Sequence, residues 1–149
     1  MKSILSAFAA AVVLAGSVYS QTDRSRDPDR EAIRQTALDY IEGWYEGNAV
    51  RMERALHPDL AKRIVRTNAQ GQSQLQQMSA MGLVQGVKRG GGNQTPKEKQ
   101  QKDVIILDLF ENAASVKIIA SDWVDYLHIA KSNGRWVIVN VLWELKPQR

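Results

Sequence analysis

The chain has 149 residues, which suits one domain. It contains no cysteine, which excludes disulfides, thiol catalysis and cysteine-based zinc sites. The formal net charge at pH 7 is +4, and the lysines and arginines are spread along the chain. Because nucleic-acid binding needs a concentrated basic face, we expect no nucleic-acid partner.

The first twenty residues have the pattern of a signal peptide. Lys2 supplies a positive charge, residues 4–16 form an apolar run, and Val18 and Ser20 precede Gln21 at the positions that signal peptidases prefer. The run is too short to span a bilayer in a mature protein. No cysteine follows it, so we expect no lipid anchor. We therefore predict removal of residues 1–20 and a periplasmic or secreted protein.

Helical patterns dominate the first part of the mature chain. After a flexible leader at 21–28, Asp27 and Pro28 form a helix start, and Gly47 is suited to end that helix. Its apolar stripe consists of Ile33, Ala37, Tyr40, Ile41 and Trp44. Asn48 is the predicted cap of a second, short helix that His57 and Pro58 end.

The middle of the chain is less regular. Residues 60–67 alternate weakly and predict a strand. Residues 73–76 resemble a capping box, which favours a third helix around residues 75–82. We expect a flexible loop at 88–94, which contains three consecutive glycines, and a single helical turn at 95–98.

From Asp103 onward the apolar period changes from 3.6 to 2, which is typical of strands. We predict strands at 104–110, 114–120, 123–131 and 135–145, the last two joined by a tight turn at Asn133-Gly134. Helices followed by hairpin-linked strands indicate an α+β fold. We expect N-terminal helices packed on a curved C-terminal antiparallel sheet, in one domain at 29–147.

The predicted tight turn fixes the register of the last hairpin. Counting back from Ser132 opposite Arg135, the register puts Asp125, Leu127 and Asn140 on one face. The other face then carries Tyr126, His128, Val139, Val141 and Trp143. Both faces are strongly apolar, so one is expected to cover the helices and the other to form a homodimer. The alternative is a tolerated apolar surface patch.

Asp125 and Asn140 are the polar residues of the predicted inner face. In this register they are diagonal neighbours, with backbones roughly 7–8 Å apart. A carboxylate in apolar surroundings must be hydrogen-bonded, have a raised pKa, or face a wet cavity. Asp125 is therefore the first candidate for a functional acid. A structural hydrogen bond between Asp125 and Asn140 is the alternative.

His57 is the second candidate, because histidine suits proton transfer near neutral pH and Asp59 stands close enough in sequence to orient it. The alternative is a helix cap followed by a surface turn. Two histidines without metal-ligand spacing do not predict a metal site, and the glycine run at 90–92 lacks the flanking elements of a phosphate loop. We expect no cofactor.

Four segments together resemble the putative lumazine-binding family of the nuclear transport factor 2-like (SnoaL-like) superfamily. They are YIEGWYEGN at 40–48, ALHPDLAKR at 55–63, DYLHI at 125–129 and GRWVIVNVLW at 134–143. The resemblance covers about residues 29–147. It implies a cystatin-like cone, a curved antiparallel sheet wrapped around helices, with a pocket inside and dimerisation through the outer sheet face. The superfamily holds isomerase-like, dehydratase and epoxide hydrolase enzymes as well as non-catalytic domains, so the fold leaves function open.

Three functions follow as hypotheses. The first is an exported protein that binds a small apolar or aromatic molecule, with Trp44, Tyr126 and Leu127 around the ligand and Asp125 and Asn140 as polar contacts. The second is an isomerase, dehydratase or hydrolase in which Asp125 or His57 is the general base and Asn140 or Tyr126 polarises a substrate oxygen. The third is a non-catalytic dimeric module.

Overall fold

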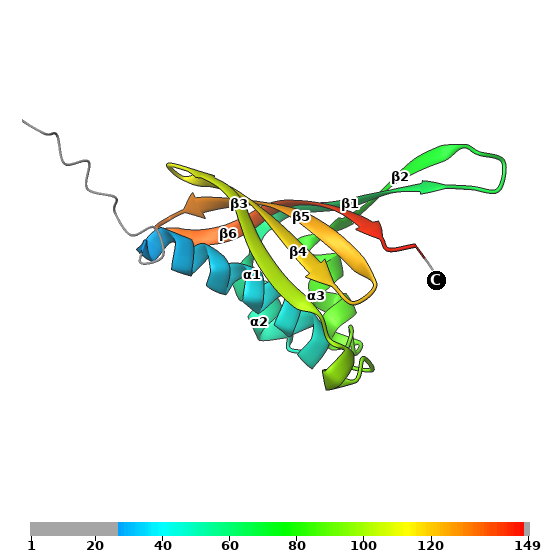
Figure 1. Cartoon of the computed structure of the whole chain (residues 1–149), viewed down its shortest axis with the longest axis horizontal. Helices are drawn as coiled ribbons and strands as arrows, with labels where there is room; N and C mark the ends of the chain where they lie inside the picture. The colour runs from blue at the N-terminus through cyan, green and yellow to red at the C-terminus, as the bar shows by residue number, and fades with distance from the viewer. Residues whose placement is uncertain (1–26, 148–149) are drawn as a thin grey trace, which may run out of the picture.

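The computed structural model describes residues 27–147 (Figure 1). Within them the chain forms three α-helices, one 3-10 turn and six strands. In chain order these are α1 Pro28–Glu46, α2 Ala49–Ala55, β1 Leu56–Thr67, β2 Ser73–Ser79, α3 Ala80–Lys88, η2 Lys97–Lys99, β3 Lys102–Phe110, β4 Ala113–Ala120, β5 Trp123–Ser132 and β6 Arg135–Leu145. The predicted signal peptide and most of the predicted leader lie outside the described residues. No helix in 27–147 is long and apolar enough to cross a membrane.

The first helix begins and ends, and the second helix begins, where their capping residues predict; α2 ends at Ala55, before the predicted His57 and Pro58, which lie in β1. The Asp27 side chain accepts a hydrogen bond from the Asp29 N–H at 3.0 Å, and Gly47 ends α1 in the left-handed conformation with φ 64°. Asn48 caps α2 by accepting from the Arg51 N–H at 3.1 Å. These helix ends are confirmed because each depends on contacts within a few residues.

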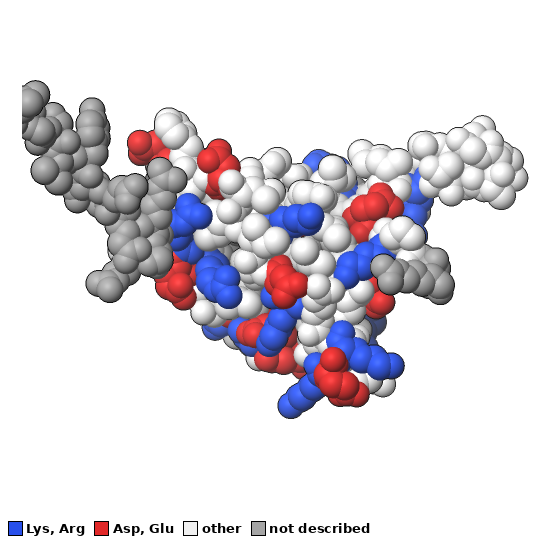
Figure 2. All heavy atoms as spheres, in the orientation of Figure 1, with Lys and Arg blue, Asp and Glu red and all other residues white. Residues whose placement is uncertain are grey.

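The six strands form one curved sheet in the order β2-β1-β6-β5-β4-β3 (Figure 1). All neighbours are antiparallel except β1 and β6, which are parallel. The three helices lie against one face of the sheet, which we call the inner face; the opposite one is the outer face. The predicted α+β cone is confirmed. The β1–β2 hairpin projects beyond the body, and it is largely uncharged where Figure 2 shows it.

The predicted third helix at 75–82 is wrong. Residues 73–79 are strand β2, which pairs antiparallel with β1 from Ala61 opposite Ser79 to Thr67 opposite Ser73. The intervening turn is fixed by Asn68, whose side-chain oxygen accepts from the backbone N–H groups of Gln70 and Gln72. The helix starts instead after Ser79. Pairing with β1 therefore overrides the local capping pattern of β2.

The predicted register of the last hairpin holds only near its turn. Ser132 lies opposite Arg135 as expected, and Ile129 lies opposite Ile138. The next pair is His128 with Asn140, so Val139 is an extra residue in a β-bulge. Beyond the bulge every β6 side chain lies on the face opposite to the predicted one, because side chains alternate along a strand.

This shift changes the face of the candidate site and interface residues of β6. Asn140 lies on the outer face and does not share the inner face with Asp125, so that prediction is wrong. Val141 and Trp143 lie opposite Leu127 and Asp125 on the inner face, not on the outer face. Val141 has no exposed surface and belongs to the hydrophobic core.

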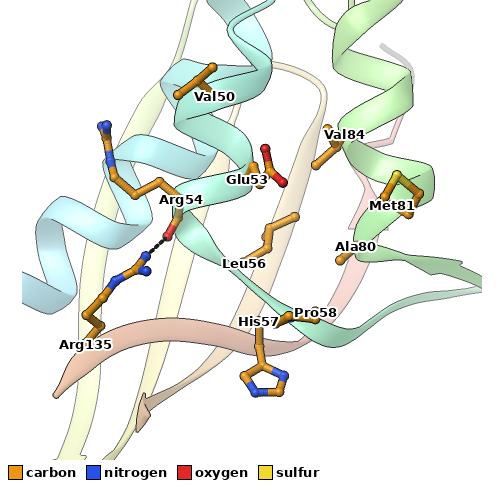
Figure 3. Close-up of a pocket in the computed structure, with 10 residues that line it drawn as sticks. All are labelled: Val50, Glu53, Arg54, Leu56, His57, Pro58, Ala80, Met81, Val84 and Arg135. Carbon is orange, nitrogen blue, oxygen red and sulfur yellow. Dashed lines mark hydrogen bonds between the residues drawn. The ribbon is translucent and has the colours of Figure 1, made fainter. Parts of the chain in front are cut away.

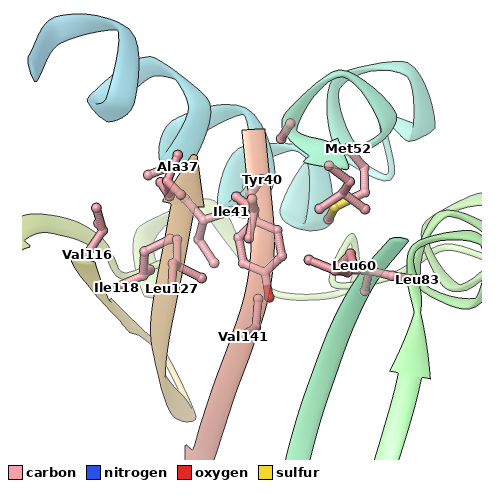
Figure 4. Close-up of a cluster of buried hydrophobic side chains, with 14 of the residues drawn as sticks. Ala37, Tyr40, Ile41, Met52, Leu60, Leu83, Val116, Ile118, Leu127 and Val141 are labelled. Carbon is pink, nitrogen blue, oxygen red and sulfur yellow. The ribbon is translucent and has the colours of Figure 1, made fainter. Parts of the chain in front are cut away.

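The core fills the space between the helices and the inner face (Figure 4). Its fully buried apolar residues are Ile33, Ala37, Ile41, Met52, Val116, Ile118, Ala120, Ile138 and Val141. They come from two helices and from strands far apart in sequence. The core therefore locks the helices onto the sheet and fixes the walls of whatever space remains inside.

Tyr126 and Leu142 face each other across β5 and β6 on the outer face, 45% and 50% exposed. His128 and Asn140 form the adjacent pair. The homodimer stays a prediction. With the observed register, Tyr126 and Leu142 are the apolar residues expected at the centre of its interface.

We expect Leu142→Asp to convert a dimer into a monomer, because a carboxylate at the centre of an apolar interface is desolvated without a partner. Sedimentation velocity measures the change. Met81→Asp is the matched control, since Met81 is an exposed apolar residue of α3, on the helical side. A parent chain that is monomeric at micromolar concentration would refute the predicted dimer.

Candidate functional site

A buried ion pair lies on the inner face. Lys62 of β1 donates from Nζ to Asp125 Oδ1 of β5 at 2.6 Å. The two strands are not neighbours, because β6 runs between them. Asp125 has no exposed surface and Lys62 is 7% exposed. The pair therefore brings opposite charges together across the width of one strand, away from water.

Tyr40 and Trp123 complete this group, which we call the Lys62–Asp125 cluster. The Lys62 Nζ also donates to the Tyr40 hydroxyl at 2.6 Å, and Trp123 Nε1 donates to Asp125 Oδ2 at 2.6 Å. Both carboxylate oxygens thus have a donor. Buried charges persist in proteins when they are paired and hydrogen-bonded in this way.

Burial changes the proton equilibria of the cluster. It lowers the pKa of Lys62, while the charge of Asp125 and its hydrogen bond act in the opposite direction. Burial also raises the pKa of Tyr40 well above its usual value, and the negative charge of Asp125 adds to that rise. Tyr40 is therefore a neutral phenol near pH 7, suited to hydrogen bonding and not to acting as a phenolate.

A cavity of about 260 Å³ adjoins the cluster, and we call it the tryptophan pocket. Its lining residues are Tyr40, Trp44, Met52, Lys62, Met78, Leu83, Trp123, Trp143 and Leu145. They come from all three helices and from β1, β2, β5 and β6. A concave apolar space with a few polar groups is the usual form of a small-molecule site.

Three indole rings shape this pocket. Trp44 and Trp123 meet edge to face, with centroids 6.3 Å apart. The Trp143 ring lies 4.8 Å from the Lys62 ammonium and 5.7 Å from the Arg66 guanidinium. Both distances are within the range of cation–π attraction. The pocket thus combines flat aromatic walls with positive charge next to one of them.

Close approach to Trp44 explains the glycines of the loop that follows α3. The Gly92 N–H donates to the Trp44 carbonyl at 2.9 Å. A Cβ at Gly92 would lie 2.5 Å from Trp44 Cδ1, and one at Gly91 would lie 2.9 Å from the Trp44 carbonyl oxygen. Gly91 also has a positive φ of 50°. The loop is therefore a packed support for one wall of the pocket.

The structure separates the candidate residues predicted from sequence. Asp125 is in the cluster and Trp44 lines the tryptophan pocket. Leu127 is 1% exposed and belongs to the hydrophobic core, and it does not line the pocket. Tyr126 and Asn140 are on the outer face, where Asn140 accepts from Arg63 Nη1 at 2.9 Å.

His57 lies elsewhere, beside a groove of about 580 Å³ between α2, α3 and the start of β1 (Figure 3). Its Nδ1 accepts from the Asp59 backbone N–H at 3.1 Å, and Asp59 Oδ2 is 3.8 Å away. The ring points away from Glu53 in Figure 3. His57 and Asp125 therefore do not converge on one site.

Sequence reasoning missed Lys62, Tyr40, Trp123 and Trp143 as site residues. A signal for Lys62 was present, because it occupies an apolar position of an alternating strand, between Leu60 and Ile64. Among residues 27–147, no three histidine, aspartate or glutamate side chains gather as a metal site would require. The arrangement supports holding a small molecule against aromatic walls beside a charged donor.

Comparison with known proteins agrees with this architecture. The model of the family described as putative lumazine-binding matches residues 28–144, so the chain belongs to that family. The predicted resemblance is confirmed. No curated protein matches the chain.

Solved structures share the fold at low sequence identity. An NTF2-like protein of unknown function from Shewanella baltica OS155 has a TM-score of 0.63 and 19% identity, covering 80% of this chain and 95% of that one. Another from Methylobacillus flagellatus KT has a TM-score of 0.63 and 18% identity, covering 80% and 93%. A cystatin-like domain of unknown function from Nostoc punctiforme PCC 73102 has a TM-score of 0.53 and 12% identity, covering 80% and 78%.

We expect Asp125→Asn to destabilise the fold by about 3–5 kcal/mol, because it leaves the buried Lys62 without its counter-charge. Urea denaturation measures the difference. Glu46→Gln makes the same chemical change in a surface pair with Arg51 and should cost less than about 1 kcal/mol. Equal effects of the two substitutions would contradict a special role for the buried pair.

We expect Gly92→Ala to displace Trp44 and to destabilise the fold by about 1–3 kcal/mol through overpacking. Near-ultraviolet circular dichroism reports the indole environment and thermal melting the stability. Gly86→Ala is the matched control: its Cβ would meet the same side chain at an ordinary 3.8 Å. An unchanged indole spectrum for Gly92→Ala would show that the loop does not hold Trp44.

Proposed function

We propose that the chain binds a small, largely apolar or aromatic molecule in the tryptophan pocket. The observation that carries this proposal is the cavity of about 260 Å³ lined by Trp44, Trp123 and Trp143. Apolar and aromatic surface around a cavity gains free energy when a ligand displaces water from it. Membership of a family described as putative lumazine-binding also supports a ligand-binding role.

The size of the pocket favours a small ligand. A volume of 260 Å³ corresponds to about nine water molecules at ~30 Å³ each, which suits one or two fused rings. The edge-to-face indoles Trp44 and Trp123 offer both ring faces and ring edges to such a molecule.

Catalysis by Asp125 as a general base gains no support from its surroundings. Its carboxylate has no exposed surface and accepts from Lys62 and Trp123. A general base must reach the proton that it abstracts, directly or through one water. Its environment supports a structural role that positions Lys62, which does line the pocket. Export of the mature chain stays a prediction from the first twenty residues.

The proposal is tested by thermal melting and tryptophan fluorescence with a panel of fused-ring aromatic and steroid-like compounds. A ligand at a hundredfold excess over its Kd should stabilise the fold by about 2.7 kcal/mol and alter the fluorescence of the pocket indoles. Small aromatic compounds should bind more tightly than steroid-sized ones because of the cavity volume.

Met78→Trp gives the matched test, because Met78 lines the pocket from β2 and is 43% exposed. The larger side chain should occupy the pocket and weaken binding at least about tenfold. Leu75→Trp is the control on the same strand, where Leu75 faces the outer side of the hairpin. Equal binding by both variants and the parent would place the ligand elsewhere, and no binding by any compound would overturn the proposal.

A further inference from the structure

The Lys62 ammonium carries one more donor than the Lys62–Asp125 cluster uses. An ammonium has three N–H groups. Two of them donate to Asp125 and Tyr40, and the third meets no oxygen or nitrogen acceptor among the described residues. The Trp143 ring, 4.8 Å away, is at best a weak acceptor. The Lys62 side chain is 8% exposed and lines the pocket, so its ammonium is the charged group of the lining that lies next to a bound molecule.

Positive charge predominates around the pocket. Among the described residues that line it, Lys62 is the one charged side chain, and no carboxylate is present. Asp125 balances the charge of Lys62 and is not itself a lining residue. Arg66 adds a second cation over the Trp143 ring, and it makes no ion pair or hydrogen bond with another described residue. A ligand with an acidic group would therefore gain a hydrogen bond from Lys62 and the attraction of the unpaired charge of Arg66.

We propose that the molecule bound in the tryptophan pocket is a small aromatic anion, such as an aromatic carboxylate. Its ring lies against the indoles, one oxygen accepts from the third N–H of Lys62, and Arg66, whose guanidinium lies 5.7 Å from the Trp143 ring, attracts the charge. This inference rests on the proposed function, since it assigns the chemical class of the ligand of the same pocket.

The geometry disfavours the two nearest alternatives. A cationic ligand would bring a third positive charge close to Lys62 and Arg66 with no carboxylate in the lining to offset it. A purely apolar ligand would bury the third N–H of Lys62 without an acceptor, and leaving a charged donor unpaired is costly. An oxygen anion gives the third N–H of Lys62 an acceptor and is attracted by the unpaired charge of Arg66.

Four probes of similar shape separate these cases by isothermal titration calorimetry with the intact chain. They are 2-naphthoate, 2-naphthamide, 2-naphthylmethanol and 2-naphthylmethylammonium. We expect 2-naphthoate to bind at least about tenfold more tightly than the alcohol, as expected for a hydrogen bond to a charged group, and the ammonium to bind most weakly. The amide presents the same acceptor without the charge and should fall between the acid and the alcohol.

Two arginines of β1 provide matched variants. Arg66→Gln removes the cation over Trp143 and should weaken 2-naphthoate binding about two- to fivefold, while leaving the alcohol unchanged. Arg63→Gln removes the same charge from the outer face of the same strand and should change neither affinity. Lys62→Met should abolish the preference for 2-naphthoate over the alcohol. If Lys62→Met does not fold, Arg66→Gln still tests the inference.

The outcomes distinguish this inference from the proposed function. Tightest binding of 2-naphthoate, with the expected loss in Arg66→Gln and none in Arg63→Gln, supports the aromatic anion. Equal affinity for acid, amide and alcohol, or tighter binding of the ammonium, overturns the inference and leaves the pocket as an aromatic site. If neither these four probes nor the larger panel binds, both are overturned.

Discussion

The buried pairing of Lys62 with Asp125 is the constraint on which the site depends. Two charges with almost no contact with water must be satisfied inside an apolar fold, so partners have to reach them from other elements. Tyr40 does so from α1 and Trp123 from β5. The cluster thereby ties the first helix to the sheet through the hydrogen bond between Tyr40 and Lys62.

The pocket is a consequence of the same packing. Large rings surround the cluster, and the edge-to-face contact of Trp44 with Trp123 leaves space beside it that apolar side chains do not fill. The glycines at 91 and 92 let the chain after α3 press against Trp44, which keeps that wall in place. Rigid aromatic walls favour a preformed site, in which a ligand loses little affinity to reorganisation.

Features that depend on neighbouring residues could be predicted from the sequence, and they account for most of the fold. Features that depend on contacts between distant segments could not. The cap at Asp27, the stop at Gly47 and the turn at Asn133-Gly134 depend on neighbouring residues, and each is where the sequence predicts it. Residues 73–79 form a strand only because β1 lies beside them. The bulge at Val139 has no glycine or proline to mark it. Because of this one extra residue, Asn140 lies on the outer face and Val141 on the inner face, the reverse of the prediction.

The alternation of apolar residues in two strands contains a signal for the buried pair of the candidate site. Lys62 stands between the buried Leu60 and Ile64, and Asp125 stands before the buried Leu127 at the same spacing. Opposite charges at apolar positions of one sheet must lie on its covered face, where each needs the other. The alternation of the two strands predicts the pair without knowledge of the register, whereas the predicted pairing of Asp125 with Asn140 depends on a register that the bulge at Val139 shifts. Lys62 therefore has a part in both stability and the proposed recognition. The contacts with Asp125 and Tyr40 let its charge stay buried, and they leave its third N–H without an oxygen or nitrogen acceptor among the described residues.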